Sequence, residues 1–125
     1  MFHIGAIAVP LNYRWKTAEL MSILERVRPA LYIGDVRLSR KVDGVDPSIL
    51  ALERRFFVGE SGEDDDMQLW SGLLADETSF TPSVARDTYS PAVLVAKFDT
   101  AGIKFVAHTH AKLMALFGLP FLCGL

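Results

Sequence analysis

The sequence has few cysteines, no excess of basic charge and no long apolar segment, and each shortage excludes a class of protein. Cys123 is the single cysteine, so no disulfide can form within the chain, as in proteins of reducing compartments. Thirteen basic residues against fifteen acidic ones give a net charge of −2, which argues against a nucleic-acid partner. No run of about 18 apolar residues exists, so we predict no transmembrane segment and expect a cytoplasmic protein.

What is present is the composition of a globular protein. Half of the 125 residues are hydrophobic and 22% are charged, which excludes an intrinsically disordered chain. The length suits one domain built around a single core. We therefore predict one domain over residues 1–125.

The pattern of apolar residues predicts alternating strands and helices. Ile4–Val9 is a short apolar run with the character of a buried strand. Thr17 is the predicted N-cap of a helix that cannot continue past Pro29. Residues 30–33 then form a second strand. Strand, helix and strand in this order form the βαβ unit of a parallel sheet, which predicts an α/β fold. One face of the helix carries Leu20, Ile23, Leu24 and Val27.

The rest of the chain continues the alternation less regularly. Residues 59–66 are rich in acidic side chains and glycine, which indicates a solvated loop, and residues 78–91 have the composition of a linker. The remaining predicted elements are a short helix over 47–52, a strand over 55–58, a helix over 67–75, a strand over 92–96, and a helix from His108 or Thr109 that Gly118 and Pro120 interrupt.

Residues 113–125 are almost entirely apolar. Thirteen residues are too few to cross a bilayer, so such a run is normally a core element that another layer covers. The covering layer must come from earlier residues or from a second copy, and an exposed run would form an association surface. We expect a homo-oligomer that associates through this C-terminal segment.

Two stretches carry sequence motifs. The first reads Gly-Ala-Ile-Ala-Val-Pro-Leu-Asn-Tyr-Arg over residues 5–14, followed by Thr-Ala-Glu-Leu over 17–20. The second reads Asp-Thr-Ala-Gly-Ile-Lys-Phe-Val over residues 99–106, followed by His-Thr-His over 108–110. Both resemble the adenylate-forming (AMP-binding) superfamily of acyl-CoA synthetases, luciferases and peptide-synthetase adenylation domains. The second stretch is similar to the family's phosphate-binding loop, Ser-Gly-Thr-Thr-Gly-x-Pro-Lys-Gly-Val.

The resemblance implies a fold and a reaction. The fold is a three-layer parallel sheet flanked by helices, a partial flavodoxin-like subdomain from the N-terminal domain of a fatty-acid–CoA ligase, which makes this chain a truncated domain. The family joins a carboxylate to ATP, with Mg²⁺, to form an acyl-adenylate and then passes the acyl group to coenzyme A. Thr100, Gly102 and Lys104 match the loop and are the candidate cofactor-binding residues.

Departures from the family's loop predict that this chain binds ATP poorly or not at all. Phe98 and Asp99 stand where the family has Ser-Gly, and Phe105 stands where it has Gly. A phosphate loop depends on glycines that let main-chain N–H groups approach an anion closely. Asp99 also adds a negative charge beside the expected triphosphate. The family's catalytic lysine lies after the loop, so we predict no catalytic residue and an inactive chain.

Each candidate residue also has a structural interpretation. Lys104 could hold a phosphate or be a solvated loop lysine, and the altered loop favours the second. Thr100 is more typical of a turn. His108 and His110 lack the further ligands of a zinc site, so Thr109 as a helix N-cap is favoured over metal binding. Residues 63–66 indicate a solvated turn rather than a calcium loop, and Cys123 has no nearby base to make it a nucleophile.

Three functions are compatible with these observations. The first is descent from an adenylate-forming ligase without independent activity. The second is a non-catalytic module that associates with itself or with a full-length synthetase. The third, a small flavodoxin-like nucleotide binder, is disfavoured by the contiguous match over residues 5–20.

Overall fold

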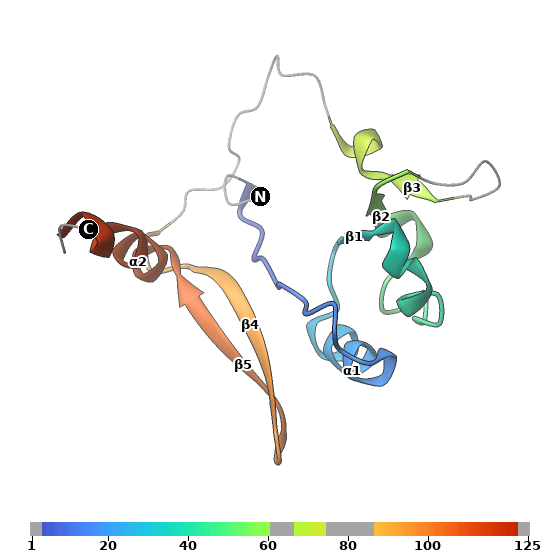
Figure 1. Cartoon of the computed structure of the whole chain (residues 1–125), viewed down its shortest axis with the longest axis horizontal. Coiled ribbons are helices and arrows are strands. Elements are labelled where there is room, and N and C mark those ends of the chain that lie inside the picture. The colour runs from blue at the N-terminus through green and yellow to red at the C-terminus, as the bar shows by residue number, and fades with distance from the viewer. Residues whose placement is uncertain (1–3, 61–66, 75–86, 123–125) are drawn as a thin grey trace. The chain divides into compact units, whose positions relative to one another are not determined.

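The computed structural model describes residues 4–60, 67–74 and 87–122, with side chains as far as residue 116 (Figure 1). The chain divides into two compact units. Residues 12–79 form one, here called the sheet unit, and residues 1–11 and 80–125 form the other, here called the hairpin unit. The sequence predicts one domain with a single core, whereas the structure groups its contacts into two units.

The sheet unit contains a parallel three-stranded sheet flanked by helices, which confirms the predicted α/β class. Strand β2 lies in the centre, with β1 and β3 on either side. The strands are β1 (Tyr32–Asp35), β2 (Arg55–Val58) and β3 (Gln68–Leu69), and the helices are α1 (Thr17–Val27) and the 3₁₀ helices η2 (Val36–Lys41), η3 (Leu52–Arg54) and η4 (Trp70–Leu73).

Helix α1 forms where the apolar spacing predicts it. Its buried face consists of Leu20, Ile23 and Leu24. The helix ends before Arg28, whose φ of 44° is left-handed and whose N–H donates to the Leu24 carbonyl at 2.8 Å. The prediction of Thr17 as N-cap is wrong by one residue. Lys16 occupies that position, and its N–H donates to the Glu19 carboxylate at 2.7 Å, because Glu19 reaches back from the first turn.

A buried arginine organises the interior of the sheet unit. Arg55 opens β2 with 4% of its surface exposed, and its guanidinium makes four hydrogen bonds of 2.7–3.2 Å. The acceptors are the main-chain carbonyls of three buried residues, Val42, Val45 and Leu50, and the Leu50 carbonyl accepts two of the four bonds. Because these carbonyls turn inward to the guanidinium, the segment that precedes β2 is a series of turns, and the predicted helix over 47–52 is wrong.

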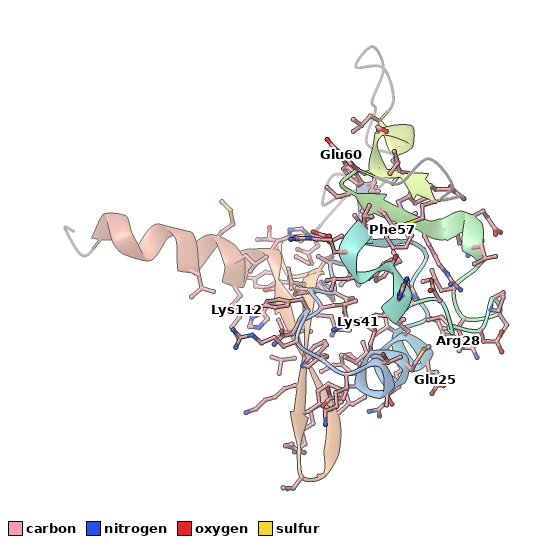
Figure 2. All side chains as sticks on the ribbon, turned by 45° about the vertical axis from the view of Figure 1, so that its right-hand side comes forward. Glu25, Arg28, Lys41, Phe57, Glu60 and Lys112 are labelled. Carbon is pink, nitrogen blue, oxygen red and sulfur yellow. The ribbon has the colours of Figure 1, made fainter. Side chains whose placement is uncertain are left out.

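The end of η2 is tied to the chain that precedes α1. The Lys41 ammonium donates to the main-chain carbonyls of Tyr13, at 2.5 Å, and Trp15, at 2.9 Å (Figure 2). Lys41 therefore holds the segment before α1 against the end of η2.

The hairpin unit is built on two long antiparallel strands and a helix. They are β4 (Pro91–Asp99), β5 (Gly102–Thr109) and α2 (His110–Leu122). The prediction of Ile4–Val9 as a buried strand in one parallel sheet with the strand that follows α1 is wrong. In that segment only Ala8 makes a bridge, and its partner is Val93 of β4, with hydrogen bonds of 2.9 and 2.8 Å on either side. Ile4 and Ile7 are exposed.

Further predictions differ from the structure. The helix predicted over 67–75 is instead β3 followed by η4. Strand β4 is longer than predicted, and β5 occupies residues that the sequence indicated as loop and helix start. Gly118 and Pro120 do not interrupt α2, which continues to Leu122. Cys123, the acidic segment 63–66 and most of the predicted linker lie outside the described residues. Among the described residues, no helix is both long and apolar enough to span a membrane.

Candidate functional site at the β4–β5 turn

All three candidate cofactor-binding residues lie in or next to the turn that joins β4 to β5. The strand register continues to the pair Asp99 and Gly102, so Thr100 and Ala101 alone form the turn. Gly102 has a φ of 108°, a conformation that side chains with a Cβ rarely adopt. Lys104 follows two residues later, inside β5. Gly102 therefore has a local role, which is to let the chain leave the turn in register.

The Asp99 carboxylate holds two hydrogen-bond donors at this turn. Its Oδ1 accepts the Ala101 N–H at 2.8 Å, and its Oδ2 pairs with the Lys104 ammonium at 2.5 Å. The hydrogen bond from Lys104, and then that from Ala101, lowers the pKa of the Asp99 carboxyl below its usual value. Asp99 is therefore a carboxylate at neutral pH, with both oxygens engaged.

The two faces of the hairpin differ in character. Partners in an antiparallel pair project to the same face, so Lys97 lies beside Lys104, its register partner. Both lysines are exposed, as is Val95 further along the same face. The other face carries Ala96, Phe98, Ile103 and Phe105, which are buried or half-buried. The polar face therefore presents two cations and one carboxylate near the turn.

The strand ladder limits what this turn can bind through its main chain. A phosphate loop needs several N–H groups that converge on one anion. Here the strands remain paired as far as Asp99 and Gly102, and the Ala101 N–H already donates to a side chain of the same turn. The structure brings Thr100, Gly102 and Lys104 close together, and their assignment as nucleotide-binding residues stays a prediction.

The histidines after β5 belong to the start of α2. The Thr109 hydroxyl accepts the Lys112 N–H at 3.2 Å, which confirms Thr109 as the N-cap. His108 has a buried Nδ1 with no hydrogen-bond partner. Within the described ranges, no group of three or more potential metal ligands comes together.

A hollow lies at the carboxyl ends of β1 and β2, where parallel sheets commonly bind ligands. It has a volume of about 400 Å³ and is lined by Asp35, Val36, Arg37, Gly59 and Glu60. Both oxygens of the Asp35 carboxylate accept hydrogen bonds from Arg37, and these bonds lower the Asp35 pKa to about 2. Sequence analysis missed this hollow, although Gly34-Asp35 and Gly59-Glu60 each stand at or just after a strand end.

Known proteins resemble this chain in fold but not detectably in sequence family. No protein-family model matches the sequence, and no curated protein matches it. Solved structures do match at the level of the fold, and three of them are described here. A luciferase-like enzyme from the nonluminescent mealworm Zophobas morio aligns with 97% of this chain, with a TM-score of 0.74 and 18% identity. A protein described as a long-chain-fatty-acid CoA ligase from Rhodopseudomonas palustris aligns with 95%, with a TM-score of 0.78 and 21% identity.

MbtA of Mycobacterium smegmatis also matches, and it aligns with 88% of this chain, with a TM-score of 0.65 and 20% identity. All three are members of the adenylate-forming superfamily, so the predicted likeness of fold is confirmed. The chain spans 28%, 29% and 20% of the lengths of these proteins, in the same order. Its fold is that of one part of such an enzyme.

Proposed function

We propose that this chain derives from an adenylate-forming acyl-CoA ligase and that its β4–β5 turn does not bind ATP. The likeness of fold to three adenylate-forming proteins supports the descent. The observation that carries the second part is the closed turn, in which the strands remain paired as far as Asp99 and Gly102. Without a bound nucleotide, the chain does not activate a carboxylate on its own.

The residues at the turn do not fit a triphosphate with Mg²⁺. The cations on the polar face are Lys97 and Lys104, and Lys104 is paired with Asp99 at 2.5 Å. A triphosphate beside the Asp99 carboxylate meets a repulsion of about 1 kcal/mol per unit charge at 4 Å, even in water. The Ala101 N–H points to that same carboxylate. The turn therefore takes no part in the family's reaction.

Calorimetric titration of the full chain with ATP and Mg²⁺ tests the proposal. We expect no binding at micromolar ATP. The variant Lys104→Met is the matched control, because it removes the one family-matched cation from the turn. Micromolar binding that Lys104→Met abolishes would overturn the proposal. Binding that Lys104→Met leaves unchanged would place the nucleotide elsewhere and leave the turn without a phosphate role.

A second candidate function is association with another copy of the chain through the C-terminal helix. Two exposed side chains of α2 favour it, because Met114 and Leu116 have 72% and 54% of their surfaces in solvent. Large apolar side chains gathered on one helix are typical of surfaces that another chain covers. Such a copy would bury these side chains.

Light scattering coupled to a sizing column tests this association. We expect a dimer or a larger assembly that the double variant Met114→Gln, Leu116→Gln converts to a monomer. Lys112→Gln, a polar change at an exposed position of the same helix, is the control and should leave the mass unchanged. A wild-type chain that is monomeric at all concentrations rules out this second candidate.

A further inference from the structure

We propose that, in a dimer of this chain, helix α2 of each copy covers the open face of the parallel sheet in the other copy. The open face is defined here as the side of the sheet that carries Ile33, Phe56 and Val58. This inference rests on the second candidate function, association through α2. It deepens that candidate, because it names the surface that α2 meets on the second copy.

The two faces of the parallel sheet differ in burial. Tyr32 and Phe57 lie on one face, with their rings in edge contact, and both are buried. The residues next to them in each strand project to the other face. There Ile33 is 37% exposed and Val58 is 50% exposed, and Phe56, the register partner of Ile33, is half-buried. The part of the chain that the structure describes therefore covers one face of this sheet and leaves the other largely open.

An open face on a parallel sheet indicates a missing layer. Parallel sheets occur almost only with both faces covered, and the covering elements are helices. The apolar surface also extends beyond the strands, because the same alternation places the exposed side chains of Leu31, before β1, and Trp70, after β3, on this side. Contiguous apolar surface of this kind marks a place where another element packs. A helix with exposed apolar side chains is the element that fits.

Helix α2 has the length and the side chains for this role. Its 13 residues span about 20 Å. Strands β1 and β2, with four residues each, span about 13 Å, so the helix is long enough to cross the whole face. Met114 and Leu116 of α2 are exposed and supply the apolar contact.

The charges on the two surfaces have opposite signs. Asp35 and Glu60 lie at the carboxyl ends of β1 and β2, which is one end of the open face. Arg37 already pairs with Asp35, so Glu60 is the carboxylate that remains for a second copy. Helix α2 contains no acidic residue, and it carries the exposed Lys112. An ion pair at the rim orients the helix and adds little free energy, so neutralising Lys112 alone should leave the mass unchanged.

The size of the open face favours a reciprocal exchange between two copies. Stable interfaces bury about 1,200–2,000 Å² in total. Three strands of four, four and two residues offer only part of that area. A two-fold arrangement uses the same contact twice and closes the assembly. A second copy therefore fits better than a single helical peptide does.

Light scattering of sheet variants tests which surface α2 meets. The double variant Ile33→Gln, Val58→Gln makes the open face polar and leaves α2 intact. We expect its dimer dissociation constant to rise by at least about tenfold over that of the wild type. Leu52→Gln, at an exposed apolar position of η3 outside the sheet, is the matched control and should change the constant by less than about twofold. A double variant that dimerises as tightly as the wild type overturns the inference.

A paramagnetic label locates the contact without altering the open face, so the test does not depend on a variant that folds. Cys123 is the single cysteine and directly follows α2, so a nitroxide on its thiol marks the end of that helix. This chain is mixed with an isotope-labelled chain that carries no nitroxide, and the NMR signals of the second chain are recorded. We expect broadening of the Ile33 and Val58 amides.

The outcomes separate this inference from the candidate function beneath it. Broadening confined to the amides of α2 would show that the two helices meet each other, which contradicts the inference and keeps association through α2. A wild-type chain that is monomeric at all concentrations removes both. A dimer with no broadening in the open face also contradicts the inference.

Discussion

The sheet unit and the hairpin unit each hold a hydrogen-bonded charged side chain, Arg55 buried in the first and Asp99 at the surface in the second. In the sheet unit, Arg55 is 4% exposed and gives all its hydrogen bonds to main-chain carbonyls. In the hairpin unit, Asp99 and Lys104 pair at the surface, where water screens their attraction. A buried charge fixes the path of the chain, whereas an exposed pair leaves the fold nearly unchanged and decides what can bind. Substitutions in the two units should therefore affect different measurements.

The largest expected effect is the loss of the buried guanidinium. Arg55→Met leaves three buried carbonyls without their donor, which should lower the free energy of unfolding by about 3 kcal/mol. Urea unfolding measures this change. Arg54→Met, at the exposed neighbouring position, is the matched control and should change the free energy of unfolding by less than about 0.5 kcal/mol. Equal effects of the two variants would show that Arg55 does not organise the interior.

A smaller effect is expected at the hairpin turn. Gly102→Ala forces a Cβ onto a residue with a φ of 108°, which should cost about 1 to 2 kcal/mol in local strain. Gly72→Ala is the control, because a Cβ there also meets open space and no positive φ is required. Thermal unfolding of both variants tests whether the conformation of Gly102, rather than crowding, makes it necessary. A Gly102→Ala protein as stable as Gly72→Ala would contradict this account.

The next largest effect is expected from removing a single methyl group from the core of the sheet unit. Ile23 is fully buried in α1, so Ile23→Val should lower the free energy of unfolding by about 1 kcal/mol. The partly exposed Val27 on the same helix is the control position, and Val27→Ala should cost less per methyl group removed. If the two positions cost the same per methyl group, α1 does not bury the face described here.

The smallest effect concerns pH. The Asp35 pKa is lowered to about 2 by hydrogen bonds from Arg37, so the unfolded chain, with a carboxyl pKa near 3.8, binds protons more readily than the folded one. The stabilisation from this pair is therefore complete above about pH 4 and is lost as the pH falls through 2. The lowered Asp99 pKa has the same sign in the hairpin unit.

NMR titration of the Asp35 carboxyl checks this pH dependence. Arg37→Met should return its pKa toward 3.8, whereas Arg40→Met, on the same 3₁₀ helix and without a bond to Asp35, should leave it near 2. An unchanged Asp35 pKa in Arg37→Met would contradict the assignment.

The sequence correctly predicts those helices and strands that depend on the spacing of neighbouring residues. Helix α1 follows from the spacing of Leu20, Ile23 and Leu24, and β2 has the predicted bounds. The prediction for residues 4–9 is wrong because an apolar run does not reveal which strand it will pair with. Ala8 makes its bridge to Val93 of β4. The buried role of Arg55 could not be predicted, since it depends on where three distant carbonyls point.

The sequence identifies the residues of the candidate site but does not predict the hairpin turn on which they lie. The resemblance to a phosphate loop identifies Thr100, Gly102 and Lys104, but it predicts a loop where the structure has the start of β5. Apolar and polar residues alternate from Ile103 to Val106 only in part, which weakens the strand signal. A glycine directly after a short turn between two β-prone runs is the feature that predicts a hairpin here.

The most direct test of the central claim is a two-dimensional NMR spectrum of the full-length wild-type chain with and without ATP and Mg²⁺. The account predicts that the amide signals from Lys97 to Lys104 do not move at micromolar to low millimolar nucleotide, because the turn is closed and Asp99 holds its donors. Saturable shifts of the Ala101 and Gly102 amides at micromolar ATP would contradict it, since they would show nucleotide phosphates bound at the turn.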